Sequence, residues 1–233
     1  MGFMQREVRQ WRRSGETGGE KRIVIIGAGG HAGVIADLIE AAAGKHCPGG
    51  ISFLDDRIPA GTMVYGYRVE GKISDCMRYP SGTEFIIGIG DNGMRGKIAA
   101  EYELNYITLV HPGAVIAGNV SLGKGTVVMA GAVVGRGTRI GEHCIINTGA
   151  TVDHACVLGD FVHISPGAHL GGEVRIGDGS WLGIGSCVRQ GIEVGKDVTA
   201  GAGAAVVKNI EEKGIYTGIP AKKAQDENIN TGK

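Results

Sequence analysis

An apolar residue recurs at every sixth position of this chain for about a hundred residues. The series runs through Val110, Ile116, Leu122, Val128, Val134, Ile140, Ile146, Val152, Leu158, Ile164, Leu170, Ile176, Leu182, Val188, Val194, Ala200 and Val206. The 3.6-residue period of a helix cannot keep this spacing on one face, and an antiparallel sheet would need hairpin turns between its strands. The spacing therefore predicts a coil of short parallel strands that turns each of these residues into one narrow core.

Two other positions of the six-residue repeat are restricted in size. The residue two before the apolar one is usually small, as in Thr108, Ala114, Thr126, Ala132, Thr138, Ala150, Ala168, Ser180, Ser186 and Ala204. The residue directly after the apolar one is often glycine, as in Gly123, Gly135, Gly141, Gly159, Gly171, Gly177, Gly183, Gly195 and Gly201. We expect the small residue to fit beside the inward one. We expect the glycine to take the corner, where a side chain would strain the backbone.

Composition restricts the partners and the compartment. The chain has 24 basic and 24 acidic residues, so no basic field favours nucleic acid. No stretch approaches the ~20 apolar residues that a membrane span needs. The five cysteines form no Cys-x-x-Cys pair, and Cys144 and Cys156 fall at the small position of their repeats, which predicts core residues rather than ligands. Residues 1–20 are polar and lack the apolar segment of a secretory signal, so we expect a poorly ordered extension and a cytoplasmic protein.

Residues 21–105 have the pattern of a βαβ unit. The apolar run RIVIIG (22–27) leads into GAGGHAG (27–33) and a helical segment, and ISFLDD (51–56) and EFIIGIGDN (84–92) indicate two more strands. We expect a small α/β, Rossmann-like domain of about three strands. Gly29 and Gly30 would let a ligand approach the amides at a helix N-terminus, where an anion is favoured.

A glycine-rich turn of this kind also occurs in NAD-dependent oxidoreductases. Here Ala32 stands at the third glycine of that fingerprint, and a repeat region follows instead of a second dehydrogenase half. These departures argue against a nicotinamide cofactor.

The order of the segments resembles one family closely: the hexapeptide-repeat sugar acetyltransferases that carry an N-terminal nucleotide-sugar-binding domain. The matching segments are GAGGHAG (27–33), FLDD (53–56), GIGDNGMR (88–95), INTGATVDH (146–154), GDFVHISPGAHLGG (159–172), GIGSCV (183–188) and VVKNIEEKGIYTGIPAKK (206–223). The resemblance implies an all-β left-handed parallel β-helix over residues 106–223, with three hexapeptides per coil, followed by a tail to residue 233. It also implies a homotrimer.

The resemblance further implies an activity. It predicts an acetyl-CoA-dependent acetyltransferase acting on the amino group of a nucleotide-linked 4-amino-4,6-dideoxy sugar, with UDP as the expected nucleotide. Acetylation of a hydroxyl on a sugar or sialic acid stays open. The match carries nucleotide-sugar binding onto Gly29, Gly30, His31, Asp55, Asp56 and Gly90, and acetyl-CoA binding onto Asn147, His163, Ile184 and Ala202.

Acetyl transfer to an amine needs a base for the amine proton and donors for the oxyanion. Histidine suits the first role near neutral pH. The repeat region holds His143, His154, His163 and His169, and because none is at an inward position we do not expect any of them to fill the core of the coil. The resemblance assigns His154 as the general base. The family commonly has an acidic residue directly after this histidine, whereas this chain has Ala155, with Asp153 before the histidine, so these two neighbours bear on how the base is tuned.

Several histidines on a β-helix also raise the possibility of a zinc enzyme of the carbonic anhydrase type. Such enzymes use three histidines, two of them five residues apart. The four histidines here are separated by 11, 9 and 6 residues, which argues against a metal site.

Overall fold

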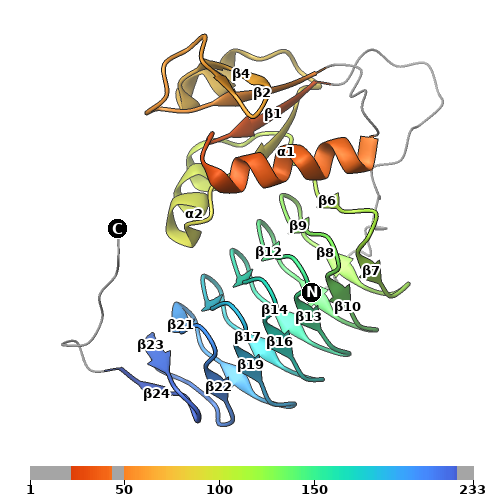
Figure 1. The fold of residues 1–233 in the computed structure, drawn as a ribbon, viewed down its shortest axis with the longest axis vertical. Coiled ribbons are helices and arrows are strands. Elements are labelled where there is room, and N and C mark those ends of the chain that lie inside the picture. Colours follow the sequence, from red (N-terminus) through yellow and green to blue (C-terminus); the bar gives the residue numbers. More distant parts are fainter. Residues whose placement is uncertain (1–21, 44–49, 225–233) are drawn as a thin grey trace.

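The computed structural model describes residues 22–43 and 50–224. Figure 1 shows an α/β domain lying over one side of a long coil of parallel strands. The α/β domain followed by a parallel β-helix is confirmed. The extension expected at residues 1–20 lies outside the described residues. No helix in the described part of the chain is long and apolar enough to cross a membrane.

The α/β domain contains a five-stranded sheet in the order β3-β4-β2-β1-β5. Its elements are β1 (Ile23–Ile26), α1 (Gly30–Ala43), β2 (Ile51–Leu54), β3 (Met63–Val64), β4 (Tyr67–Gly71), the 3-10 helix η1 (Ile73–Arg78), β5 (Glu84–Ile87) and α2 (Asn92–Glu101). Strand β1 pairs in parallel with β2 and β5, and these are the three strands that the sequence predicts. The expectation that the domain stops at about three strands was wrong. A hairpin of β3 and β4 extends the edge, turning at Tyr65 and Gly66, which both have positive φ.

The strands of the coil form three faces. The first face carries β6 (Leu109–Val110), β9 (Val127–Val128), β12 (Ile145–Ile146), β15 (His163–Ile164), β18 (Trp181–Leu182), β21 (Val198–Ala200), β23 (Gly214–Thr217) and β24 (Lys222–Lys223). The second face carries β7 (Val115–Ile116), β10 (Val133–Val134), β13 (Thr151–Val152), β16 (His169–Leu170), β19 (Cys187–Val188) and β22 (Ala205–Val206). The third face carries β8 (Ser121–Leu122), β11 (Arg139–Ile140), β14 (Val157–Leu158), β17 (Arg175–Ile176) and β20 (Glu193–Val194).

The register of these faces confirms three hexapeptides per coil. Residues 18 positions apart are partners, as in the pairs Ile145↔His163 and His163↔Trp181. The predicted inward residues from Val128 to Val206 are all buried, while the first three of the series are half-buried because the coil begins there. Cys144 and Cys156 are fully buried beside them, as predicted from their small-residue position.

The expected role of the repeat glycines needs correction. The residues with positive φ are not those directly after the inward position but those three after it: Gly125, Gly131, Gly137, His143, Gly149, Ala155, Phe161, Gly167, Glu173, Gly179, Gly185, Gly191, Asp197 and Gly203. The glycines directly after the inward residue are required for a different reason, because adjacent coils approach closely there. A Cβ on Gly141 would lie 2.5 Å from the carbonyl oxygen of Gly159.

The first face carries the α/β domain. The outward side chains of Leu109, Val127 and Ile145 are buried in one cluster with residues of α1, which lies between the domain's sheet and the coil (Figure 1). The same outward column continues with His163 and Trp181. The side chains of this column become more exposed toward its C-terminal end, where Trp181 is 46% exposed. The apolar contact with α1 therefore ends at Ile145, and His163 and Trp181 follow it in the same column.

Candidate active site

The glycine-rich turn is fixed by Asp55. Its Oδ2 accepts a hydrogen bond from the Ala28 amide at 2.8 Å, and its Oδ1 accepts from the amides of Arg57 and Ile58 at 2.8 and 3.1 Å. Asp55 thus ties the loop after β1 to the loop after β2. Asp56 accepts from the Ile73 amide at 3.0 Å and so anchors η1 to the same region.

The glycines of the turn differ in what they are needed for. Gly27 has φ +94, and a Cβ there would lie 2.7 Å from the Ile89 side chain. Gly29, Gly30 and Gly90 have ordinary φ values, and a Cβ on any of them would meet nothing within 4 Å. Protein packing therefore does not require glycine at these three positions. The open space before the first amides of α1 suits a phosphate.

His31 and His163 both lie within electrostatic reach of Arg95, where the two parts of the chain join. His31 Nε2 is buried and has no hydrogen-bond partner among the described residues. Burial and the nearby Arg95 cation lower the pKa of His31 to about 4. Burial, Arg95 and His31 together lower the pKa of His163 to about 3, against a weaker opposing effect of the Gly90 backbone. Both imidazoles are therefore neutral near pH 7.

The ring of His163 is held on two sides. Its Nε2 lies 3.2 Å from Nδ2 of Asn147, which can only donate, so Nε2 is the acceptor of this hydrogen bond. The ring stacks on Trp181 with a centroid distance of 5.7 Å and an interplanar angle of 6°. Trp181 in turn donates from Nε1 to Ser165 Oγ at 2.7 Å. The sequence gives no role to Trp181, although the 18-residue register would have placed it beside His163.

None of the repeat histidines occupies an inward position of the coil, yet two of them are buried on its outside. His143 is 1% exposed and His163 is 8% exposed. Neither points into the coil; both face the α/β domain, which covers them. His143 packs between Tyr106 and Phe161, at centroid distances of 4.6 and 5.4 Å. Burial, with the cations of Lys124 and Arg95, lowers the pKa of His143 to about 4.

His154 is exposed at the corner between the second and third faces. Its amide donates to Asp153 Oδ1 at 2.6 Å, so this carboxylate is engaged with the backbone. Ala155 follows at φ +55. The imidazole lies over Gly172 of the next coil: a Cβ on Gly172 would lie 2.4 Å from His154 Nε2. The imidazole can occupy this position only because residue 172 has no side chain. The sequence alone does not show that Gly172 lies beside His154, because that follows from the 18-residue register.

The structure separates the predicted site residues into groups. Gly29, Gly30, His31, Gly90 and His163 gather at the junction of the α/β domain with the first face. Ile184 and Ala202 occupy equivalent positions of successive coils on the corner between the first and second faces, and Asn147 belongs to the same corner. His154 lies on a different corner, so one protomer does not bring its predicted base to the junction.

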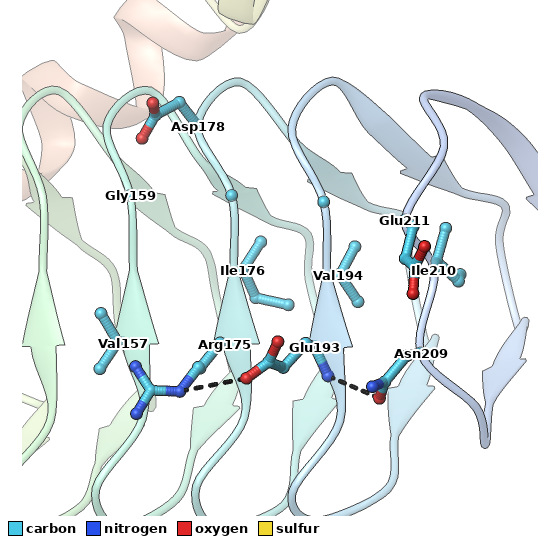
Figure 2. Close-up of a pocket in the computed structure, with 12 residues that line it drawn as sticks. Val157, Gly159, Arg175, Ile176, Asp178, Glu193, Val194, Asn209, Ile210 and Glu211 are labelled. Carbon is cyan, nitrogen blue, oxygen red and sulfur yellow. Dashed lines mark hydrogen bonds and ion pairs between the residues drawn. The ribbon is translucent and has the colours of Figure 1, made fainter.

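A cavity of about 340 Å³ opens on the third face. Figure 2 shows Arg175 and Glu193 on neighbouring strands, with Asn209 beyond them. Arg175 Nε is 3.5 Å from Glu193 Oε1, and the Glu193 amide donates to Asn209 Oδ1 at 3.1 Å. None of the predicted site residues lines this cavity. Within residues 22–43 and 50–224, no group of three His, Cys, Asp or Glu side chains could hold a metal ion.

Comparison with known proteins identifies the family. Residues 22–102 match the family described as the PglD N-terminal domain. UDP-N-acetylbacillosamine N-acetyltransferase of Bacillus subtilis (strain 168) is 35% identical over 110 residues, which are 45% of this chain and 50% of that protein. This chain therefore matches about half the length of that relative.

Solved structures cover much more of the chain. The acetyltransferase domain of PglB from Neisseria gonorrhoeae FA1090 is 41% identical, with a TM-score of 0.81 over 88% of this chain and 100% of that one. It has also been solved with acetyl coenzyme A. An H-to-N mutant of perosamine N-acetyltransferase from Caulobacter crescentus, in complex with CoA and GDP-perosamine, is 34% identical, with a TM-score of 0.81 over 88% of this chain and 97% of that one. The chain therefore belongs to the hexapeptide-repeat sugar acetyltransferases with an N-terminal PglD domain, and it is an acyltransferase.

Proposed function

We propose that this protein transfers the acetyl group of acetyl-CoA to the 4-amino group of a UDP-linked 4-amino-4,6-dideoxy sugar. The observation that carries the proposal is the junction at His31 and His163. Open space around Gly29 and Gly30 suits a diphosphate on one side, and a neutral imidazole beside the repeat corner suits a thioester on the other. The relatives that bind CoA together with a nucleotide sugar support this division.

The proposed roles follow from the chemistry of the side chains. His154 accepts the amine proton as nitrogen attacks the thioester carbonyl carbon. The carbon–sulfur bond then breaks, and the CoA thiolate takes that proton from the imidazolium. His163 and Asn147 contact the thioester region, and Ile184 and Ala202 lie along the path of the CoA arm. His31, Asp56 and Gly90 contact the nucleotide sugar, while Asp55 holds their loop. Asp153 and Ala155 are the neighbours that bear on the basicity of His154.

We further propose that the active form is a homotrimer. His154 and the junction lie on different edges of one protomer, so an edge of a second protomer can bring its His154 to the junction of the first. The second face supports such packing, since it exposes Val115 and Val133, 63% and 41% respectively. We expect sedimentation equilibrium at micromolar concentration to give three chains per particle. A fully active monomer would overturn the shared site.

The acceptor can be tested with a panel of nucleotide sugars and acetyl-CoA, following release of free thiol. We expect a UDP-linked 4-amino sugar to give a kcat/KM at least about tenfold above its GDP-linked counterpart, because base contacts discriminate between nucleotides. The 4-hydroxy analogue should be turned over far more slowly, because a hydroxyl is the weaker nucleophile. Calorimetry should show binding of UDP and none of NAD.

Three outcomes would contradict parts of this proposal. A preference for the GDP-linked sugar would change the nucleotide. Equal turnover of the hydroxyl analogue or of sialic acid would favour O-acetylation. Binding of NAD without UDP would remove UDP as the ligand of the α/β domain.

A further inference from the structure

Arg95 is buried between the two parts of the chain. It lies in the first turns of α2 and is 2% exposed. All five N–H groups of its guanidinium have acceptors: Nε donates to His143 O at 3.0 Å, Nη1 to Ile89 O at 3.2 Å and Gly90 O at 2.8 Å, and Nη2 to Asn92 Oδ1 at 2.8 Å and Phe161 O at 3.1 Å. Burial lowers the pKa of Arg95 to about 10, so the group stays charged near pH 7.

These acceptors belong to two structural parts. Ile89 and Gly90 form the loop after β5 in the α/β domain, whereas His143 and Phe161 are the left-handed corners of two successive coils. The rings of His143 and Phe161 stack on each other, with centroids 5.4 Å apart. Both corners thus present a carbonyl oxygen to the same cation.

Asn92 extends the contact to a third coil. Its Oδ1 accepts from Arg95, and its Nδ2 donates to the carbonyl oxygens of Gly179 and Ser180 at 2.9 and 3.3 Å. A short polar network at the start of α2 therefore fixes the loop of Gly90 against three consecutive coils. Apolar contacts alone would let the α/β domain shift along the coil, whereas these directional hydrogen bonds hold the domain at one position.

We propose that Arg95 is a positioning residue that holds the acceptor-binding loop at Gly90 in register with the acetyl-CoA-binding coils. The inference rests on the proposed function, in which the acceptor lies at Gly90 and the thioester at His163. Arg95 touches neither ligand in this arrangement. It acts through Gly90 on one side and through the corners at His143 and Phe161 on the other.

Lysine is the informative substitution. Arg95→Lys keeps the charge but has three donors on one nitrogen, which cannot reach acceptors on both sides of a planar fork. The acceptor subsite lies within the α/β domain and the CoA subsite within the coil, so each should remain intact. We expect calorimetric Kd values for UDP and for CoA within about twofold of wild type, while kcat falls at least about tenfold, because small misplacements of reacting groups are costly.

Ile98→Ala provides a matched control for stability. Ile98 is a buried residue of the same helix, packed within the α/β domain and not bonded to the coil. This variant should lower Tm by several degrees and keep the kcat of the folded enzyme. If Arg95→Lys does not fold, Asn92→Ala tests the same network with fewer bonds lost. It should lower kcat in the same direction with Kd values unchanged.

The outcomes separate the two proposals. An unchanged kcat in a folded Arg95→Lys enzyme would overturn the positioning role. Parallel loss of UDP and CoA binding would overturn it too, since that result indicates a general structural role. A wild-type enzyme that acetylates none of the nucleotide sugars would instead overturn the proposed function, and the role of Arg95 with it.

Discussion

The His154→Ala enzyme should lose about 10²–10⁴-fold in kcat, which is the usual effect of removing a positioned general base. The KM for acetyl-CoA should change little, because the imidazole acts mainly in the transition state. His154 is exposed at a corner, and its imidazole makes no hydrogen bond with any residue that the structure describes, so the free energy of unfolding should stay within about 0.5 kcal/mol of wild type. Thiol release under saturating acetyl-CoA and acceptor measures the effect.

His169→Ala is the matched control for this experiment. His169 is another exposed histidine of the coil, on the second face, with Nδ1 2.9 Å from Thr151 Oγ1. His169 lies in the same outward column as Val115 and Val133, so its loss removes one side chain from the proposed interface but no reacting group. At a protein concentration that keeps the trimer assembled, kcat should therefore stay close to wild type. A His154→Ala enzyme that is as active as the His169→Ala enzyme would remove the general-base assignment. Deprotonation by water would then be the next hypothesis to test.

The β-helix follows from the sequence because one physical requirement repeats without interruption. A narrow core accepts one branched apolar residue per strand, and a period of six meets this need in every coil from Val128 to Val206. The residue types at the left-handed corners are harder to predict from the sequence. Nine of the fourteen left-handed residues are glycine, whereas His143 and Phe161 adopt the same positive φ and present their carbonyl oxygens to Arg95 of the α/β domain. Such contacts depend on a neighbour that is distant in the sequence.

The candidate site, too, could be predicted only in part from the sequence. The family resemblance marks His154 and His163 as candidates, yet the sequence does not show that His163 is buried and that His154 is exposed. Burial depends on which face of the coil the α/β domain covers, and no local pattern specifies that face. Arg95 lies within a recognised segment, but only the folded chain shows that its five donors join two parts of the molecule.

Gly172→Ala should lower kcat by about 10²-fold through His154 alone. The added Cβ would lie 2.4 Å from Nε2, 2.5 Å from Cε1 and 3.0 Å from Cδ2 of the imidazole, all shorter than van der Waals contact. Gly172 has an ordinary φ, so alanine strains no backbone there. The exposed ring must move by about 1 Å or rotate away, and a displacement of that size can cost about 10²-fold in rate.

A double-mutant cycle isolates the cause of this loss. If Gly172→Ala acts by displacing the base, it should have almost no further effect on kcat in the His154→Ala background. Gly191→Ala is the control: Gly191 lies on the same corner at φ +67, with nothing within 4 Å of its Cβ position. It should lose about 1 kcal/mol of stability and no activity. Equal losses from Gly172→Ala in both backgrounds would show that Gly172 acts independently of His154, and a fully active Gly172→Ala enzyme would show that catalysis does not require the ring position over Gly172.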